Sequence, residues 1–275
     1  MRLAIISLAT CLSILPLVQA QQPAAAADDP CAAQERASFE VATIRPSDKS
    51  AGSSSMHAIR DGINATMSLR QFILRAYDLR EFQLEGGPDW VNRSVYEVHA
   101  KISPPEPEGH TLDEAARKAV QLREQQRVQS LLADRFDFKC HFTTKELPIY
   151  ELVPTKSGAK LTATTAADEK RHSISSNGNG RKTELVATGV TLDELVRYEL
   201  SGEVGRKVVD KTGLTGNYDI TLTWMPAMAS TADADAASGP TIFTALEEQL
   251  GLKLQPAKGP VPVLVIDSVE KPSEN

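Results

Sequence analysis

Residues 66–73, TMSLRQFI, lead through a turn-rich segment to residues 96–102, YEVHAKI, and this stretch decides the fold. Ser68 and Gln71 have the spacing of a capping box, in which the hydroxyl and the later side chain satisfy free N–H groups at a helix start. Apolar side chains then recur at helical spacing on one stripe, namely Leu69, Phe72, Ile73 and Ala76. Residues 96–102 alternate between apolar and polar side chains, as in a sheet with one covered face. The stretch therefore predicts a capped helix followed by a half-buried strand.

The same pattern recurs later in the chain. Residues 191–196, TLDELV, have capping-box spacing between Thr191 and Glu194, and they lead to an alternating strand at residues 218–224, YDITLTW. The two stretches share the cap, the helix stripe, the aromatic strand start and the alternation. Together these matches favour true duplication over the coincidences that any alternating α/β sequence yields.

A third unit is predicted between these two stretches. Thr111 and Glu114 have capping-box spacing at the start of a longer helix that runs through Leu132. Two strands should follow at residues 136–142 and 147–154, separated by a turn of the sequence TTKE. This unit again has the order helix, strand, turn, strand.

A fourth unit is predicted at the end of the chain. Residues 241–250 read as a short helix, with Gly251 placed as its C-terminal cap. Two strands should follow at residues 252–254 and 261–269, with the proline-containing segment 256–260 between them.

These units predict the fold class. A helix with two strands cannot bury its apolar face alone, so we expect an α+β fold in which duplicated helix–strand–strand modules place their helices on mainly antiparallel sheets. One pair of modules should form residues 38–161 and a second pair residues 185–275, joined by a polar linker at residues 162–184. A first short strand at residues 39–44 should end before Pro46.

The N-terminus predicts export. A positively charged start precedes an apolar stretch at residues 3–18, and Val18-Gln19-Ala20 has the small-x-small form of a cleavage site. We interpret residues 1–20 as a signal peptide and residues 21–37 as a flexible lead-in, which makes the mature protein periplasmic or secreted. An uncleaved anchor and a lipoprotein attached at Cys11 are the weaker alternatives. No later stretch is apolar enough to cross a bilayer, so we expect no membrane span after cleavage.

Composition and motifs argue against several functional classes. The formal net charge is −6, and Lys and Arg are spread among Asp and Glu without the basic stripe that nucleic-acid binding needs. The five histidines show no two-histidine helical spacing, and no phosphate loop or dinucleotide fingerprint is present. We therefore expect no metal and no cofactor. The two histidines of predicted strands, His99 and His141, are interpreted as solvated or hydrogen-bonded strand residues.

Two cysteines remain after signal cleavage, Cys31 and Cys140. An even count in an exported protein permits a disulfide. However, Cys140 alternates with Phe138 and Phe142, which equally fits a buried thiol in a strand. Both interpretations stay open at this point.

Three short segments reproduce, in order, the signatures of serine β-lactamases and penicillin-binding proteins: SGAK at 157–160, SSN at 175–177 and KTG at 211–213. That chemistry needs the first serine at a helix start, whereas Ser157 follows a predicted strand in a turn-like segment. The spacings also leave no room for the helical domain that separates these motifs in that fold. We interpret the segments as loops and hairpin turns, and we predict no catalytic residues.

Several segments together resemble a known family. They are FEVATIRPS (39–47), GGPDW (86–90), LLADRF (131–136), LPIYEL (147–152), VDKTGLTGNYD (209–219) and VIDSVEKPSEN (265–275). They resemble the soil-associated family of exported proteins of unknown function, abundant in acidobacteria, over nearly the whole mature chain. The resemblance implies no catalytic residues. The same domain is sometimes joined to membrane metallopeptidases of the antibiotic-sensor type, which would imply envelope sensing, but this chain has no zinc motif. Residues 244–254 also resemble the short N-terminal domain of secretins and TonB-dependent receptors.

The leading hypothesis is a non-catalytic exported module that binds a protein or peptide partner in the cell envelope. Exposed strand edges and the turns around Trp90 and Asn217 are the expected contact surfaces. For Trp90, packing onto its own unit is the alternative. A first rival is an exported hydrolase whose site gathers distant residues, including His99, His141 and a carboxylate. A second rival is a structural envelope protein that self-associates through the same edges.

Overall fold

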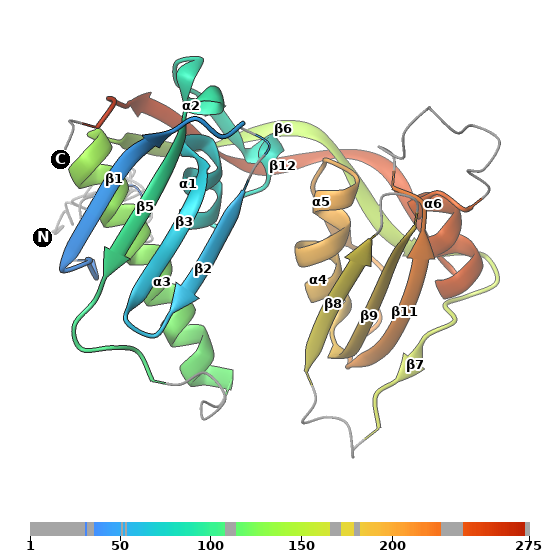
Figure 1. Ribbon diagram of the computed structural model, residues 1–275. Helices are drawn as coiled ribbons and strands as arrows, with labels where there is room; N and C mark the ends of the chain where they lie inside the picture. The colour runs from blue at the N-terminus through green and yellow to red at the C-terminus, as the bar shows by residue number, and fades with distance from the viewer. Residues whose placement is uncertain are drawn as a thin grey trace, which may run out of the picture.

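The computed structural model describes residues 31, 36–50, 52, 54–107, 114–165, 172–178, 182–226 and 239–272. They form helices and mainly antiparallel sheets, which confirms the predicted α+β class. Two halves lie side by side, and a long two-stranded ribbon passes over both (Figure 1). The expected signal peptide at residues 1–20 and the expected cap at Thr111 lie outside the described residues. Within the described ranges, no helix has the length and apolar character needed to cross a membrane.

The first half is a four-stranded antiparallel sheet with helices on one face. In spatial order its strands are β1 (Val41–Ser47), β5 (Val95–Lys101), β3 (Gly62–Ser68) and β2 (Ser55–Ile59). The covering helices are α1 (Leu69–Ala76) and α3 (Glu114–Phe136). The connection from α1 to β5 holds η1 (Glu81–Gln83), β4 (Leu84–Gly86) and α2 (Trp90–Arg93). The prediction that the first strand ends before Pro46 was wrong, because β1 is an edge strand and an edge tolerates proline.

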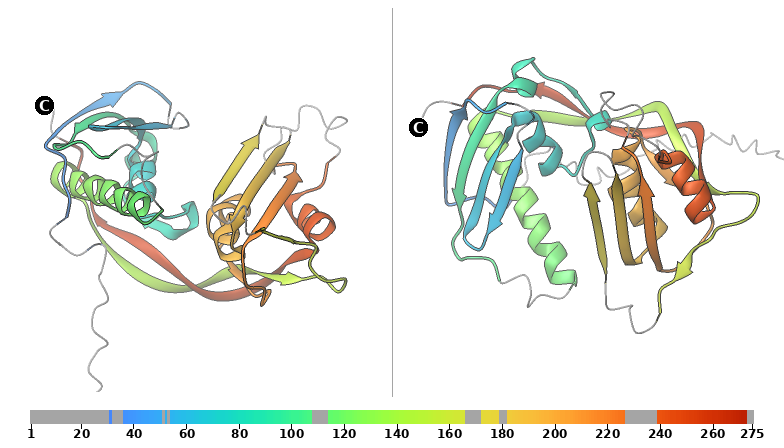
Figure 2. Two further views of the ribbon diagram at one scale, coloured as in Figure 1. Left: turned by 90° about the horizontal axis from the view of Figure 1, so that it is seen from below. Right: turned by 45° about the vertical axis from the view of Figure 1, so that its right-hand side comes forward.

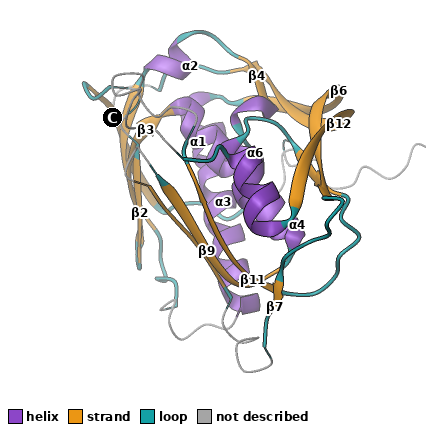
Figure 3. Cartoon of the chain, turned by 90° about the vertical axis from the view of Figure 1, so that its right-hand side faces the viewer, coloured by secondary structure: helices purple, strands orange, loops and turns teal. Residues whose placement is uncertain are grey.

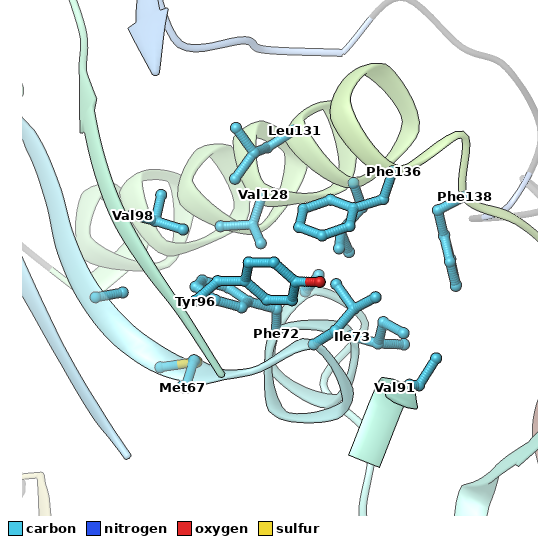
Figure 4. Close-up of a cluster of buried hydrophobic side chains, with 14 of the residues drawn as sticks. Met67, Phe72, Ile73, Val91, Tyr96, Val98, Val128, Leu131, Phe136 and Phe138 are labelled. Carbon is cyan, nitrogen blue, oxygen red and sulfur yellow. The ribbon is translucent and has the colours of Figure 1, made fainter. Parts of the chain in front are cut away.

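The core of the first half fills the space between the sheet and the two helices (Figure 4). Tyr96 from β5 meets Phe136 from α3 edge to face, with ring centroids 5.2 Å apart. The predicted capping box is confirmed, since the Ser68 hydroxyl accepts from the Gln71 N–H and the Gln71 side chain accepts from the Ser68 N–H. This cap fixes the residue at which β3 ends and α1 begins, and so it orients the apolar stripe of α1 toward the core.

The second half repeats this plan with shorter helices. In spatial order its strands are β7 (Thr162–Ala163), β11 (Tyr218–Trp224), β9 (Thr183–Val190) and β8 (Ser173–Gly178). Its helical segments are α4 (Leu192–Glu194), η3 (Leu195–Leu200), α5 (Ser201–Glu203), α6 (Ile242–Ala245) and η5 (Leu246–Leu250). The capping box of Thr191 and Glu194 is confirmed. Gly251 ends the last helix at φ 63°, where an added Cβ would meet the Gly158 carbonyl oxygen.

The segment expected to be a polar linker, residues 162–184, contains β7, β8 and the start of β9. The sequence did not predict β8. Most of its side chains are exposed, and it therefore shows no alternation of apolar and polar residues. Only Ile174 of β8 packs against the second core.

The ribbon consists of β6 (Lys139–Pro154) and β12 (Leu252–Ser268), which pair antiparallel along their length. Helices lie between this ribbon and the two sheets (Figure 3). β4 pairs parallel with β12, and β10 (Val208–Asp210) pairs parallel with β6. The prediction of two short strands in each of these regions was wrong, because each region is a single strand.

The prolines of β12 are compatible with one continuous strand. The carbonyl of Pro260 accepts from the Lys207 ammonium, and the carbonyl of Pro262 accepts from the Gln83 side chain. In an antiparallel strand, the N and C=O of one residue face the same side. The missing N–H groups of these prolines therefore face away from β6, and no ladder bond is lost.

One strand thus serves both cores. Leu252 and Leu254 of β12 lie in the second core, whereas Leu264 and Ile266 lie in the first. The division into residues 38–161 and 185–275 stays a prediction, and the shared strand gives the two halves a common support.

Candidate functional site

Two edge strands face each other across the space between the halves. β2 ends the first sheet and β8 ends the second, and both border this space in two views (Figures 1 and 2). β2 has the sequence SMHAI and β8 the sequence SISSNG, so neither carries a charged residue or a proline. Such strands offer backbone groups to another strand.

The hydrogen-bond ladder of the first sheet shows which backbone groups of β2 point to the free edge. Ile102 donates its N–H to the Asp61 carbonyl, so the odd-numbered residues of β3 bond toward β5 and the even-numbered residues toward β2. His57 lies opposite Asn64 and therefore bonds inward, to β3. Met56 and Ala58, on either side of it, direct their N–H and C=O groups to the free edge.

The same reasoning applies to β8. The N–H and C=O of Thr223 in β11 both bond to the side-chain amide of Gln249, so they point away from β9. By alternation, Val186 of β9 bonds toward β8, where it lies opposite Ser175. Ile174 and Ser176 therefore direct their N–H and C=O groups to the free edge.

The other two sheet edges are guarded. β1 carries Arg45 and Pro46, and both residue types discourage strand addition. In the second sheet, β7 pairs with only the start of β11, and the Gln249 amide occupies the backbone of Thr223 further along. Each sheet therefore has one guarded edge and one unguarded edge, and the unguarded edges face each other.

A cavity of about 370 Å³ lies where the halves meet. The first half contributes Asp78, Arg80 and Gln83 to its lining, and the second contributes Arg197 and Lys207. The Asp78 carboxylate accepts from the Arg197 guanidinium at 2.9 Å and raises the pKa of Arg197. The Arg80 guanidinium donates to the carbonyls of Arg197 and Tyr198, each at 3.1 Å. These bonds join the two halves at the cavity.

The two residues predicted as contact tips lie in different halves. Trp90 begins α2 and is half-buried against the first core, with the Lys271 ammonium 5.9 Å from its ring centroid. Asn217 is exposed before β11, and its carbonyl accepts from the Thr164 N–H. The structure does not bring them into one site.

The histidines of the hydrolase alternative have separate partners. His99 lies on the outer face of the first sheet, where its Nδ1 is 2.8 Å from Asn64 Oδ1. His141 lies on the ribbon, where its Nδ1 is 2.8 Å from Asp267 Oδ1. In the part of the chain that the structure describes, no group of three or more His, Cys, Asp or Glu side chains could hold a metal ion.

Cys31 and Cys140 form a disulfide, with their Cα atoms 5.5 Å apart. The bond joins the start of the described chain to β6, and both residues pack against the first core. It encloses a sequence separation of 109 residues.

The segments that look like β-lactamase signatures form turns and strands. Ser157 lies in the turn after β6, with its hydroxyl 2.9 Å from that of Thr155. Ser175 lies within β8, and Lys211 follows β10, where its N–H donates to the Leu152 carbonyl.

Sequence reasoning missed the contacts that join the two halves and guard an edge of the second sheet. These contacts are hydrogen bonds between residues that are far apart in the sequence, made by the side chains of Asp78, Arg80, Arg197 and Gln249. No local sequence pattern predicts such contacts. One signal was available: SMHAI and SISSNG are short segments without charge or proline in a chain where 24% of residues are charged.

The model of a family described as "Protein of unknown function (DUF3738)" matches residues 70–269. No curated protein and no solved structure matches the chain.

Proposed function

The chain belongs to this family of unknown function, and from its geometry we propose that it is a non-catalytic binding module of the cell envelope that captures an extended partner segment at β2 and β8. The observation that carries the proposal is the pair of unguarded edges that face each other. Natural sheets commonly protect their edges against pairing, and among the described residues such protection is found at the β1 and β7 edges.

The chemistry of capture is strand addition. Met56 and Ala58 offer backbone groups on one side of the space, and Ile174 and Ser176 offer them on the other. Main-chain hydrogen bonds supply affinity in this mode, and the neighbouring side chains supply specificity. Because both edge strands are uncharged, the favoured partner segment is uncharged and rich in β-branched residues.

Two observations support placement in the envelope. The first residues have the form of a signal peptide. The disulfide between Cys31 and Cys140 suits an oxidising compartment. The hydrolase alternative has less support, because His99 lies on the outer face of the first sheet and His141 lies on the ribbon, so the structure does not bring the two histidines into one site.

A selection experiment tests the proposal. Peptides are selected on the purified protein from a random displayed library, and the affinity of the best peptide is measured for Ala58→Pro and Ser176→Pro. Both prolines remove an outward N–H and leave the ladder bonds intact, so we expect each to weaken binding about tenfold. The matched controls, Ala58→Thr and Ser176→Thr, keep the N–H and should bind as the wild type does.

Two results would count against capture of a partner. Proline and threonine variants with equal affinity would show that the edges are not the contact surface. Concentration-dependent dimerisation of the protein alone, lost in the proline variants, would instead favour the self-associating structural protein.

A further inference from the structure

A second cavity, of about 470 Å³, lies between the β2–β3 hairpin and α3. Its apolar lining includes Phe39, Ile59, Ile63, Ile102 and Val120. Volumes of about 300–1,000 Å³ with mainly apolar walls are typical of small-molecule sites. Ala58, whose backbone groups point to the free edge of β2, also lines the cavity, so the two proposed sites adjoin at this residue.

The cavity exists because α3 packs along only part of its length. Its C-terminal half buries Val128, Leu132 and Phe136 in the first core. From residue 115 to residue 127 no side chain is fully buried, and Val120 is half-buried over the cavity. Val120 is therefore the apolar side chain through which this half of α3 borders the cavity.

The described residues around the cavity carry both signs of charge. Three arginines border it directly, namely Arg60, Arg117 and Arg127, together with Glu106 and Glu124. Both acids are already engaged by arginines. Arg123 and Arg127 bind Glu106 at 2.7 and 2.8 Å, and Arg75 lies 3.6 Å from Glu124. Arg117 lies exposed beside this mainly apolar cavity, so its guanidinium favours an anion there.

The position of Arg117 indicates which part of a ligand carries the charge. Arg117 is exposed at the cavity rim, one helical turn from Val120. A guanidinium at this position can bind a carboxylate through two parallel hydrogen bonds while the rest of the ligand lies on the apolar wall.

We infer that this cavity binds an amphipathic anion, a single acyl chain with a carboxylate head. The chain lies among Ile59, Ile63 and Val120, and the carboxylate meets Arg117. This inference does not depend on the proposed capture of an extended segment.

Calorimetric titration of the purified protein with hexadecanoate tests the inference, and hexadecanol serves as the uncharged comparison. Val120→Glu places a charge on the apolar wall and should weaken hexadecanoate binding about tenfold or more. Leu122→Glu is the matched control, since Leu122 is 55% exposed on the same helix and does not border the cavity. It should change the affinity by less than about twofold. Arg117→Ala, at an exposed position that leaves the fold intact, should reduce the preference for hexadecanoate over hexadecanol.

Three results would overturn the inference. The first is that the wild type does not bind hexadecanoate, as would happen if another part of the chain fills the cavity. The second is equal weakening by Val120→Glu and Leu122→Glu. The third is equal affinity for acid and alcohol that Arg117→Ala leaves unchanged. Thermal unfolding of each variant, followed by circular dichroism, verifies that the protein titrated is folded.

Discussion

The two halves of the molecule share an architecture and differ in the interactions that stabilise them. Both place a capped helix on a four-stranded antiparallel sheet, and both combine a guarded outer edge with an unguarded inner edge. The first half adds a disulfide and an acid held between two arginines. In the described part of the second half, apolar packing, a helix cap and the bonds between the Gln249 amide and the Thr223 backbone hold the helices. The stabilising interactions differ between the halves and the arrangement of edges does not, which supports the proposal that the edges are the contact surface.

Removing the disulfide should have the largest effect on stability and should show whether the first half depends on it. Cys140→Ser opens a loop of 109 residues, and we expect the free energy of unfolding to fall by about 2–5 kcal/mol. Denaturant unfolding without reductant measures the change. Wild type in reductant serves as the control and should lose a similar amount. If the free energy of unfolding falls by less than about 1 kcal/mol, the disulfide contributes little to the stability of this half.

Acid titration should reveal the ion pair of the first half. Hydrogen bonds from Arg123 and Arg127, with their charges, hold the pKa of Glu106 at about 2, below its ordinary value of 4.5. Because the folded pKa is depressed, this stabilisation is present above pH 4.5 and is lost as the pH falls toward 2.

Glu106→Gln should therefore lower the free energy of unfolding by about 1–3 kcal/mol at neutral pH. The difference from wild type should shrink as the pH falls from 4.5 toward 2. Denaturant unfolding across this range measures both quantities. A difference that does not change with pH would contradict the assigned role of Glu106.

The helix caps should contribute equally in the two halves. Ser68→Ala and Thr191→Ala each remove the side chain that caps a helix start, and each should lower the free energy of unfolding by about 1 kcal/mol. Chemical denaturation of both variants tests this. If one variant loses much more than the other, the shared plan of the two halves does not extend to their caps.

Sequence analysis succeeded where the determining contacts are local. Both capping boxes and the left-handed Gly251 depend on residues within one helical turn, and all three are found where the pattern predicts them. The alternation of residues 96–102 likewise reflects one covered face. These signals sufficed for the α+β class.

The ribbon and the facing edges could not be predicted because they depend on pairing between distant segments. β12 continues through Pro260 and Pro262 because their backbone N atoms face away from β6, on the side where their carbonyls accept from Lys207 and Gln83. β8 was hidden by its exposed polar side chains. The sequence shows that SMHAI and SISSNG lack charge, but only the sheet order shows that both are edges.

Amide hydrogen exchange with and without a selected peptide tests the central claim most directly. Strand addition should protect the N–H groups of Met56, Ala58, Ile174 and Ser176 on binding. The N–H of His57 is already bonded within the sheet, so its exchange should change much less. Protection of alternate residues in both edge strands is the result that we predict. Binding without new protection at these four amides would contradict the assignment of β2 and β8 as the contact surface.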